Sequence, residues 1–321
     1  MGSGILNIKY IIHQIGKKMR APFFKNQTNL LLNILGNVLP LDSSFVLKGG
    51  TAINFIWQNL PRLSVDIDLT YKEIGSRDDF IKANDFFYRK REEDLKNRGL
   101  LTQLQRTQDK IPKQLLVSSA EASIKIETNL ILRGTVYPTE VKKTCQAIKE
   151  QYDFELYVPT VSFEDLYAGK FCAALDRQHP RDLFDIKMFF EKYKITEKLK
   201  KAFIVYLISS NRPISEIISP NYLNQRDLYE NEFRGMTSNE VSYEELEGAR
   251  ETLIKTIREF LTLEDKEFLI NFKKANPNWS YLNLPHIKNM PAIKWKLHNI
   301  KNMNKEKHAD AINKLEKKLF S

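Results

Sequence analysis

The sequence predicts an α+β fold, with a mixed sheet in the first half and only helices in the second. Residues 65–71 alternate apolar and polar positions with the period of two that is typical of a half-buried strand. From Ser162 onward the apolar residues recur at helical spacing. At 321 residues the chain is long enough for two domains, which we place at residues 1–195 and 196–321.

The individual elements follow from the same patterns in chain order. Residues 5–40 have helical spacing that ends at Pro40, so one or two helices precede the first strand. A short helix follows two glycines and stops before Pro61, and residues 77–98 form a charged helix. Strands are expected over residues 44–48, 65–71, 100–106, 113–118, 122–130 and 154–158.

The composition excludes membrane-spanning and secreted, disulfide-rich proteins. Hydrophobic residues make up 42% of the chain and charged residues 28%, and no apolar run approaches the roughly 20 residues of a membrane span. The N-terminus lacks the pattern of a signal peptide. Two cysteines and no export signal argue against a disulfide framework and against a cysteine zinc site, so we expect a protein of the reducing cytoplasm.

Positive charge is concentrated at the end of the chain. The net charge is +10, and residues 271–321 hold eleven lysines against three acidic residues. A local field of this sign attracts polyanions such as nucleic acid. On charge alone, a solvated lysine-rich face explains the same pattern equally well.

The segment LKGGTA, from Leu47 to Ala52, has the pattern of an anion site. Glycines between a strand and a helix let the backbone approach a ligand, and the first helical N–H groups point outward unsatisfied. Phosphate is the expected occupant, and the hydroxyl of Thr51 can contact the same anion. The alternative is an ordinary Gly49-Gly50 turn. The segment is not a P-loop, because no Lys-Ser or Lys-Thr closes it.

Asp66 and Asp68 lie two residues apart on the strand that follows. Their side chains leave the same face, where two carboxylates repel each other unless a positive charge lies between them. Magnesium prefers carboxylate and phosphate oxygens, and a pair of such ions can hold both the attacking and the leaving oxygen of a displacement. The alternative is a solvent-facing strand that carries two ordinary acids.

Glu127 is a candidate third carboxylate. It lies on the polar face of the strand at 122–130, and it completes a triad if that strand neighbours residues 65–71. Glu121 is a weaker substitute, because it lies on the opposite side at the start of the strand.

Lys170 lies within an apolar helical stripe. A lysine in this position must either extend to solvent or find an anion, because burying it unpaired is costly. Asp182 and Asp185, one helical turn apart, can hold Lys170 or Arg181, or serve the start of their own helix. We interpret His179 as a loop histidine. The stripe consists of Phe163, Leu166, Tyr167, Phe171 and Ala174.

Four segments in this order resemble a known family. A Gly-Gly turn, a D-x-D strand and a later strand acid are similar to the DNA polymerase β-like nucleotidyltransferase superfamily. The string KGGTA…RLSVDIDL resembles its AbiEii toxin family, the toxin half of type IV toxin–antitoxin and abortive-infection systems. SFEDLYAGKFCAALDRQHPRDLFDI (162–186) and NPNWSYLNLPHIKNMPAIKWKLHNIKNM (276–303) extend the resemblance over nearly the whole chain. Gly50 replaces the usual serine, and fifteen residues separate it from Asp66, a longer gap than usual in the superfamily.

The resemblance implies a magnesium-dependent nucleotidyltransferase domain followed by a helical domain. Asp66, Asp68 and Glu127 would bind two Mg²⁺ ions, and the substrate would be an NTP. Lys170 and Asp182 would be functional, with Asp185 in support. Nucleotide contacts are implied for Lys48, Gly49, Gly50, Thr51, Arg62, Ser64 and Lys170.

The resemblance also implies an acceptor and a partner. Relatives transfer a nucleotide to the 3′ end of tRNA, which would inhibit translation and growth, and an antitoxin encoded nearby is implied without requiring direct contact. Trp279, Tyr281 and Trp295 among the C-terminal lysines suit RNA. Alternatively the tryptophans are core residues, which we expect of Trp295 between Ile293 and Leu297. A protein acceptor and a non-catalytic nucleotide- or RNA-binding module remain open.

Overall fold

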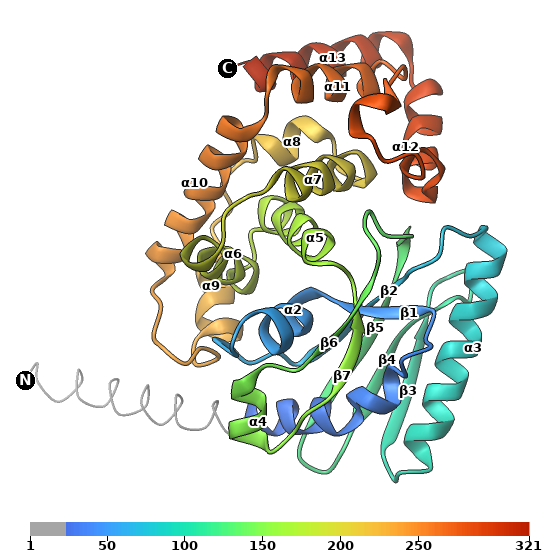
Figure 1. The fold of residues 1–321 in the computed structure, drawn as a ribbon, viewed down its shortest axis with the longest axis vertical. Helices are drawn as coiled ribbons and strands as arrows, with labels where there is room; N and C mark the ends of the chain where they lie inside the picture. The colour runs from blue at the N-terminus through green and yellow to red at the C-terminus, as the bar shows by residue number, and fades with distance from the viewer. Residues whose placement is uncertain (1–23, 321) are drawn as a thin grey trace, which may run out of the picture.

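The structure is a computed structural model that describes residues 24–320, in which a sheet lies beside a body of helices (Figure 1). The predicted α+β fold is confirmed. Residues 24–38 are helical, as predicted for that part of the chain, and the remainder of the prediction for residues 5–40 lies mostly outside the described residues. The change from mixed to helical structure comes at Phe163, close to Ser162 where the helical pattern begins.

The described residues form one seven-stranded mixed sheet in the order β3-β4-β5-β2-β1-β7-β6. Two pairs are parallel, β1 with β7 and β2 with β5, and the others are antiparallel. This order places β5, β2 and β1 at the centre, where the candidate site residues lie. The strands are β1 (Phe45–Lys48), β2 (Asp66–Tyr71), β3 (Leu101–Arg106), β4 (Pro112–Ser118), β5 (Ser123–Arg133), β6 (Glu140–Lys143) and β7 (Tyr157–Thr160).

The prediction was poorest for the last strands and the short helix between them. The strand expected at 154–158 begins three residues later, and both β6 and the helix after it were missed. β6 is a short, half-exposed edge strand with the sequence EVKK. It has one apolar residue, so its sequence shows little alternation of apolar and polar residues. The main helices are α2 (Gly49–Ala52), α3 (Arg77–Lys96), α4 (Gln146–Tyr152), α5 (Phe163–Asp176), α6 (Pro180–Lys192), α7 (Glu197–Ser209), α8 (Ile214–Ile218), α9 (Arg226–Leu228), α10 (Tyr243–Phe260), α11 (Leu263–Lys273), α12 (Pro291–Lys301) and α13 (Lys305–Phe320).

Helix α3 covers one face of the sheet. Its start is capped by Ser76, whose side chain accepts a hydrogen bond from the backbone N–H of Asp79. Phe87 packs on Phe45 of β1 with ring centroids 4.7 Å apart, and the buried Tyr88 hydroxyl donates to the backbone of the sheet. The charged helix predicted at residues 77–98 is therefore anchored by its aromatic residues.

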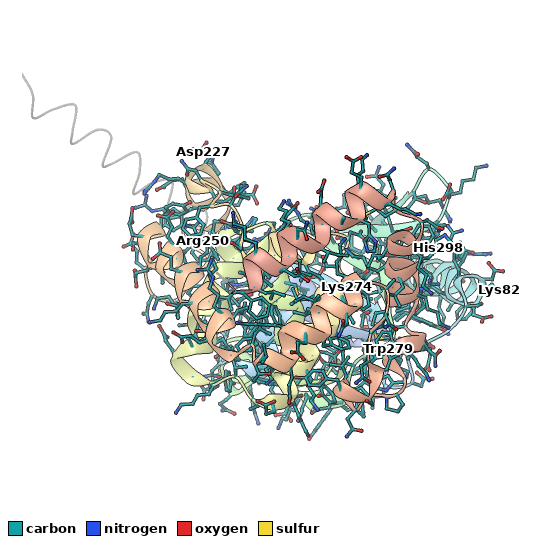
Figure 2. The ribbon with its side chains drawn as sticks, turned by 90° about the horizontal axis from the view of Figure 1, so that it is seen from above. Lys82, Asp227, Arg250, Lys274, Trp279 and His298 are labelled. Atoms are coloured by element: carbon teal, nitrogen blue, oxygen red, sulfur yellow. The ribbon has the colours of Figure 1, made fainter. Side chains whose placement is uncertain are left out.

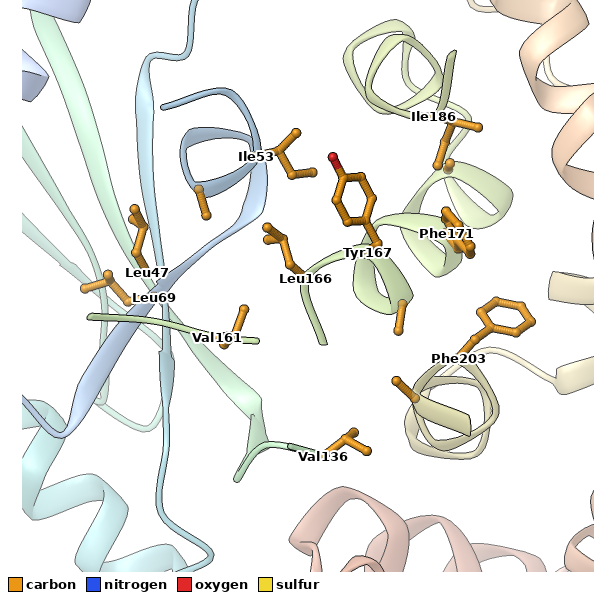
Figure 3. Close-up of a cluster of buried hydrophobic side chains, with 14 of the residues drawn as sticks. Leu47, Ile53, Leu69, Val136, Val161, Leu166, Tyr167, Phe171, Ile186 and Phe203 are labelled. Carbon is orange, nitrogen blue, oxygen red and sulfur yellow. The ribbon is translucent and has the colours of Figure 1, made fainter. Parts of the chain in front are cut away.

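Helix α5 joins the sheet to the helical body. Its Leu166 lies on the side of the sheet, its Tyr167 points toward Ile53, and its Phe171 packs against Phe203 of α7 (Figure 3). Because these side chains belong to one continuous buried cluster, the sheet and the helices share a core. The domain boundary near residue 195 stays a prediction.

Within residues 24–320, no helix combines the length and the apolar composition that crossing a membrane requires.

Asp165 ties three parts of this fold together. Its carboxylate accepts hydrogen bonds from the backbone N–H groups of Val136 (2.8 Å) and Tyr137 (2.9 Å), and from the hydroxyl of Tyr206 on α7 (3.2 Å). It is 1% exposed, so removing its carboxylate takes a buried acceptor away from these donors.

We therefore expect Asp165→Ala to lower the free energy of unfolding by about 2–5 kcal/mol, because it leaves buried donors unsatisfied. The matched control is Asp79→Ala in the exposed first turn of α3, for which a much smaller loss is expected. Urea unfolding followed by circular dichroism measures both. Equal losses in the two variants would contradict a special role for Asp165.

Candidate active site

A cavity of about 520 Å³ lies between the centre of the sheet and the helical body. Its volume is in the range of about 300–1,000 Å³ that is typical of small-molecule sites. β1, β2 and β5 line one side, and α5, α6 and α7 line the other. Six basic and six acidic side chains line it: Lys48, Arg62, Lys125, Lys170, Arg177 and Arg181, with Asp66, Asp68, Glu127, Asp165, Asp176 and Asp182.

The predicted strand, Gly-Gly turn and helix start are present at the edge of this cavity. Lys48 ends β1, and Gly49 begins α2 with a φ of +73°. A Cβ on Gly49 would overlap the carboxylate of Asp68, and one on Gly50 would overlap the guanidinium of Arg62. No side chain caps the start of α2. The glycines therefore let uncapped backbone lie directly against two charged groups.

Thr51 lies elsewhere than we expected. Its side chain is fully buried and does not line the cavity. Its hydroxyl donates to the backbone oxygen of Asp66 and lies 2.8 Å from the hydroxyl of Ser64, which does line the cavity. In the described structure Thr51 joins α2 to the start of β2 instead of reaching a ligand.

The three candidate carboxylates come together at the centre of the sheet. β2 lies between β1 and β5, so Asp68 stands opposite Lys48 on one side and Glu127 on the other. Asp66 and Asp68 share a strand face, and all three carboxylates line the cavity. The strand neighbourhood on which the triad depended is thus present, whereas Glu121 is exposed and does not line the cavity.

Burial and mutual repulsion perturb this cluster. Burial raises the pKa of Asp68, an effect that Lys48 opposes and Asp66 reinforces. Burial likewise raises the pKa of Glu127, and Asp68 and Asp66 add to it. Burial lowers the pKa of Lys48, which Asp68 opposes. The carboxylates are therefore held in an arrangement that added positive charge would relieve.

The donor set fits magnesium in chemical type. Magnesium is usually held by one or two carboxylates together with substrate phosphates, and Asp66 and Asp68 provide that pair. Within residues 24–320 no three His, Cys, Asp or Glu side chains converge enough to hold a metal by themselves. Asp66 instead lies 3.4 Å from Arg181, which occupies part of its coordination space. Substrate phosphates and water would therefore complete the coordination of a magnesium ion at this pair.

Lys170 belongs to a buried network of charges on the opposite side of the cavity. Its ammonium lies 2.8 Å from Asp182 and 2.9 Å from Asp185, and the side chain is 6% exposed. Arg62 donates to both oxygens of Asp185 at 2.8 and 2.7 Å, and Arg177 donates to Asp182 at 2.5 Å. Of the two alternatives for Lys170, pairing with an anion is the one observed.

The network sets the ionisation of both aspartates. Burial alone would raise the pKa of Asp182, but Lys170 and Arg177 hold it well below its usual range. Burial opposes ionisation of Asp185 in the same way, and Arg62 and Lys170 overcome it. Both carboxylates are therefore ionised partners of the surrounding cations at neutral pH.

Two arginines in the site were not predicted as site residues: Arg177 was not mentioned, and Arg181 was considered only as a partner of the helix aspartates. Arg177 pairs with Asp182, and Arg181 pairs with Asp66 instead of the helix aspartates that we considered for it. Their position in the segment DRQHPRD, between Lys170 and Asp185, could have indicated that they lie near the site. His179 is more than a loop histidine, because its ring accepts the N–H of Arg181 and caps the start of α6.

The C-terminal aromatic residues differ from our expectation in which of them are buried and which are exposed. Trp279 packs on Phe268 and Phe272, so it is the tryptophan that joins the core. Trp295 is 61% exposed, and the expectation that it is a core residue was wrong. Tyr281 donates its hydroxyl to the buried Asp265.

Comparisons with known proteins agree with this geometry. The model of a family described as nucleotidyl transferase AbiEii toxin, type IV toxin–antitoxin system, matches residues 33–298. Among solved structures, the nucleotidyltransferase toxin MenT4 of Mycobacterium tuberculosis is similar with a TM-score of 0.58 at 18% identity. The similarity covers 87% of this chain and 92% of that one, and at this identity it concerns the fold. No match was found among curated proteins.

The charge network predicts a pH-dependent stability. Arg62 and Lys170 hold the pKa of Asp185 below 3.8, its usual value, so the unfolded chain takes up this proton first. The stabilisation is complete above that value and is lost as the pH falls through the lower pKa of the folded state.

We expect Asp185→Asn to cost about 3–5 kcal/mol at about pH 7, because Arg62 is left without its buried partner. The difference from the wild type should shrink as the pH falls below 3.8. Urea unfolding across this pH range measures it, with Glu259→Gln in a surface pair as the control, for which less than about 0.5 kcal/mol is expected. A difference that stays constant with pH would argue against an ionised Asp185.

Proposed function

The chain belongs to the AbiEii family of nucleotidyltransferase toxins of type IV toxin–antitoxin systems, and from this premise we propose that it transfers NMP from an NTP to the 3′ hydroxyl of tRNA. The observation that carries the proposal is the meeting of Asp66, Asp68 and Glu127 in a cavity whose edge is an uncapped Gly-Gly helix start. Because the 3′ end of tRNA receives the amino acid, such transfer would inhibit translation and growth.

The triphosphate would lie between the Gly49-Gly50 edge and α5. The N–H groups at the start of α2 make no hydrogen bond to a capping side chain, so they suit a phosphate. Lys48, Ser64 and Lys170 line the same cavity and add a cation, a hydroxyl and a second cation. We assign them to nucleotide binding.

Magnesium would be held by Asp66 and Asp68, with Glu127 beside them. The cavity is lined by equal numbers of basic and acidic side chains, so the protein alone does not neutralise a triphosphate. When bound, one or two Mg²⁺ ions supply that charge and favour ionisation of the acceptor hydroxyl. Arg181 lies 3.4 Å from one carboxylate oxygen of Asp66, and its movement toward the ligand would bring its guanidinium to a phosphate oxygen.

The residues of the chain would position the reaction. The acceptor oxygen forms a bond to the α-phosphorus, the bond from that phosphorus to the bridging oxygen breaks, and pyrophosphate leaves. Glu127, whose pKa is raised mainly by burial, is suited to take the acceptor proton. Lys170 would stabilise the charge on the leaving pyrophosphate, and Asp182 and Asp185 orient its ammonium.

Three further residues would act by positioning others. Arg62 fixes Asp185 through two hydrogen bonds while lying against Gly50. Thr51 holds the backbone of Asp66, and so the start of the carboxylate strand, through its buried hydroxyl. Arg177 fixes Asp182 from the end of α5. A small displacement of any of these would misplace the reacting groups.

The charge distribution supports a nucleic-acid acceptor. Residues 271–321 carry eleven lysines and three acidic residues, far more positive charge than an NTP in the cavity requires. A field of this sign increases the rate at which a polyanion such as tRNA associates. Membership of a toxin–antitoxin family further implies an antitoxin encoded nearby.

The experiment incubates the purified protein with total tRNA, Mg²⁺ and each α-³²P-labelled NTP in turn. We expect label in tRNA with the wild type, and a loss of at least about 100-fold in Asp66→Ala/Asp68→Ala, because the transition-state charge loses its stabilisation. Asp109→Ala/Asp227→Ala removes the same charge from exposed positions and should remain active. Circular dichroism checks that all variants are folded.

The distribution of label separates the alternatives. Label in a protein band, and none in RNA, would move the function to nucleotidylylation of a protein. Transfer that survives in the Asp66→Ala/Asp68→Ala variant would sink the assignment of these carboxylates. The absence of label from every acceptor would favour the non-catalytic binding module.

A further inference from the structure

Trp295 stands out on the surface of α12. It is 61% exposed, whereas Trp279 packs into the helical core. The indole is stacked with the ring of His298, one helical turn further on, with centroids 5.7 Å apart and an interplanar angle of 16°. His298 is labelled in Figure 2, in the view from above. The pair presents aromatic surface to solvent with no role in the core.

The surroundings of this pair are basic. Between Glu267 and Glu306 the chain has seven lysines and no acidic residue. At about 100° per residue, Trp295, His298, Lys294 and Lys301 lie within an arc of about 120° on α12. All four are exposed. Aromatic surface and positive charge therefore share one face of the helix.

Helix α12 is fixed next to the cavity. The ammonium of Lys296 donates to the backbone oxygens of Ser210 (2.6 Å) and Arg212 (2.8 Å), just after the end of α7. Ser210 lines the cavity, and α12 also packs against β5, the strand that carries Glu127. The exposed face thus belongs to an element held in place beside the candidate active site.

We propose that Trp295 and His298 form a stacking platform for an unpaired nucleobase of the RNA acceptor, with Lys294 and Lys301 contacting its phosphates. This inference rests on the proposed function, since it names a surface that would hold the RNA acceptor of that reaction. Single-stranded nucleic acid is bound by this combination of aromatic faces and backbone-neutralising lysines. A protein interface is disfavoured, because lysine is depleted at the cores of such interfaces.

The test measures RNA binding without catalysis. A 5′-labelled RNA hairpin with an unpaired 3′ tail is titrated with the protein in EDTA and without NTP. We expect Trp295→Ala to weaken binding about 5- to 150-fold, as loss of one stacked base does, and Trp295→Phe to weaken it less. Phe86→Ala is the control, because Phe86 is 67% exposed on α3, far from the lysine-rich segment in the sequence. The wild type should bind the same hairpin with a blunt end more weakly than the tailed one. The Trp295→Ala variant should bind the blunt and the tailed hairpin equally.

The lysines are tested by salt dependence. Lys294→Gln/Lys301→Gln should reduce the slope of log K against log salt by about 1.4, because each phosphate contact on a single strand contributes about 0.7. Lys82→Gln/Lys90→Gln removes the same charge from exposed positions on α3 and should leave the slope nearly unchanged.

The outcomes separate this inference from the proposed function. Equal affinity in Trp295→Ala and Phe86→Ala, or no binding of RNA by the wild type, would overturn the platform. So would a change in oligomeric state on Trp295→Ala, measured by sedimentation, with RNA affinity unaltered, because the face would then be a protein contact. Tail-dependent binding that requires Trp295 supports the platform even if nucleotide transfer to tRNA fails.

Discussion

The buried pairing of Asp185 with Arg62 and Lys170 holds the two sides of the cavity together. Arg62 precedes β2, Lys170 comes from α5, and the carboxylate on α6 also accepts the side-chain amide of Asn54 at 3.1 Å. Such a network adds little net stability, because the desolvation of its charges offsets their attraction. Its main effect is on the relative position of these elements, since an unpaired buried charge would be strongly destabilising.

This constraint explains why chemistry concentrates where the sheet meets α5. The central strands supply carboxylates at fixed register, and the helices supply cations that are already oriented by aspartates. Both sets are preorganised by contacts outside the reacting groups, which is the arrangement expected to stabilise a developing charge without reorganisation. The apolar cluster of Figure 3 includes side chains of α5 and packs this helix against its neighbours.

The sequence predicted what periodicity encodes and missed what only packing determines. Apolar and polar residues alternate clearly in β2 and β5, so the sequence predicted which face of each strand carries Asp68 and Glu127. That the two strands are neighbours is known only from their pairing in the structure. Arg177 and Arg181 carry no periodic signal. Trp295 was misassigned because Ile293 and Leu297 lie two residues away, which in a helix is nearly the opposite face. Thr51 was expected at the ligand, yet its buried hydroxyl bonds to the backbone.

The close approach at Gly49 has a genetic consequence. Every missense change of this codon introduces a Cβ, at a positive φ, into space that the carboxylate of Asp68 occupies. In cells in which a growth-inhibiting protein of this family is expressed without restraint, survivors are those that inactivate it. Codon 49 is thus a site where any amino-acid replacement, however conservative, is a route to escape.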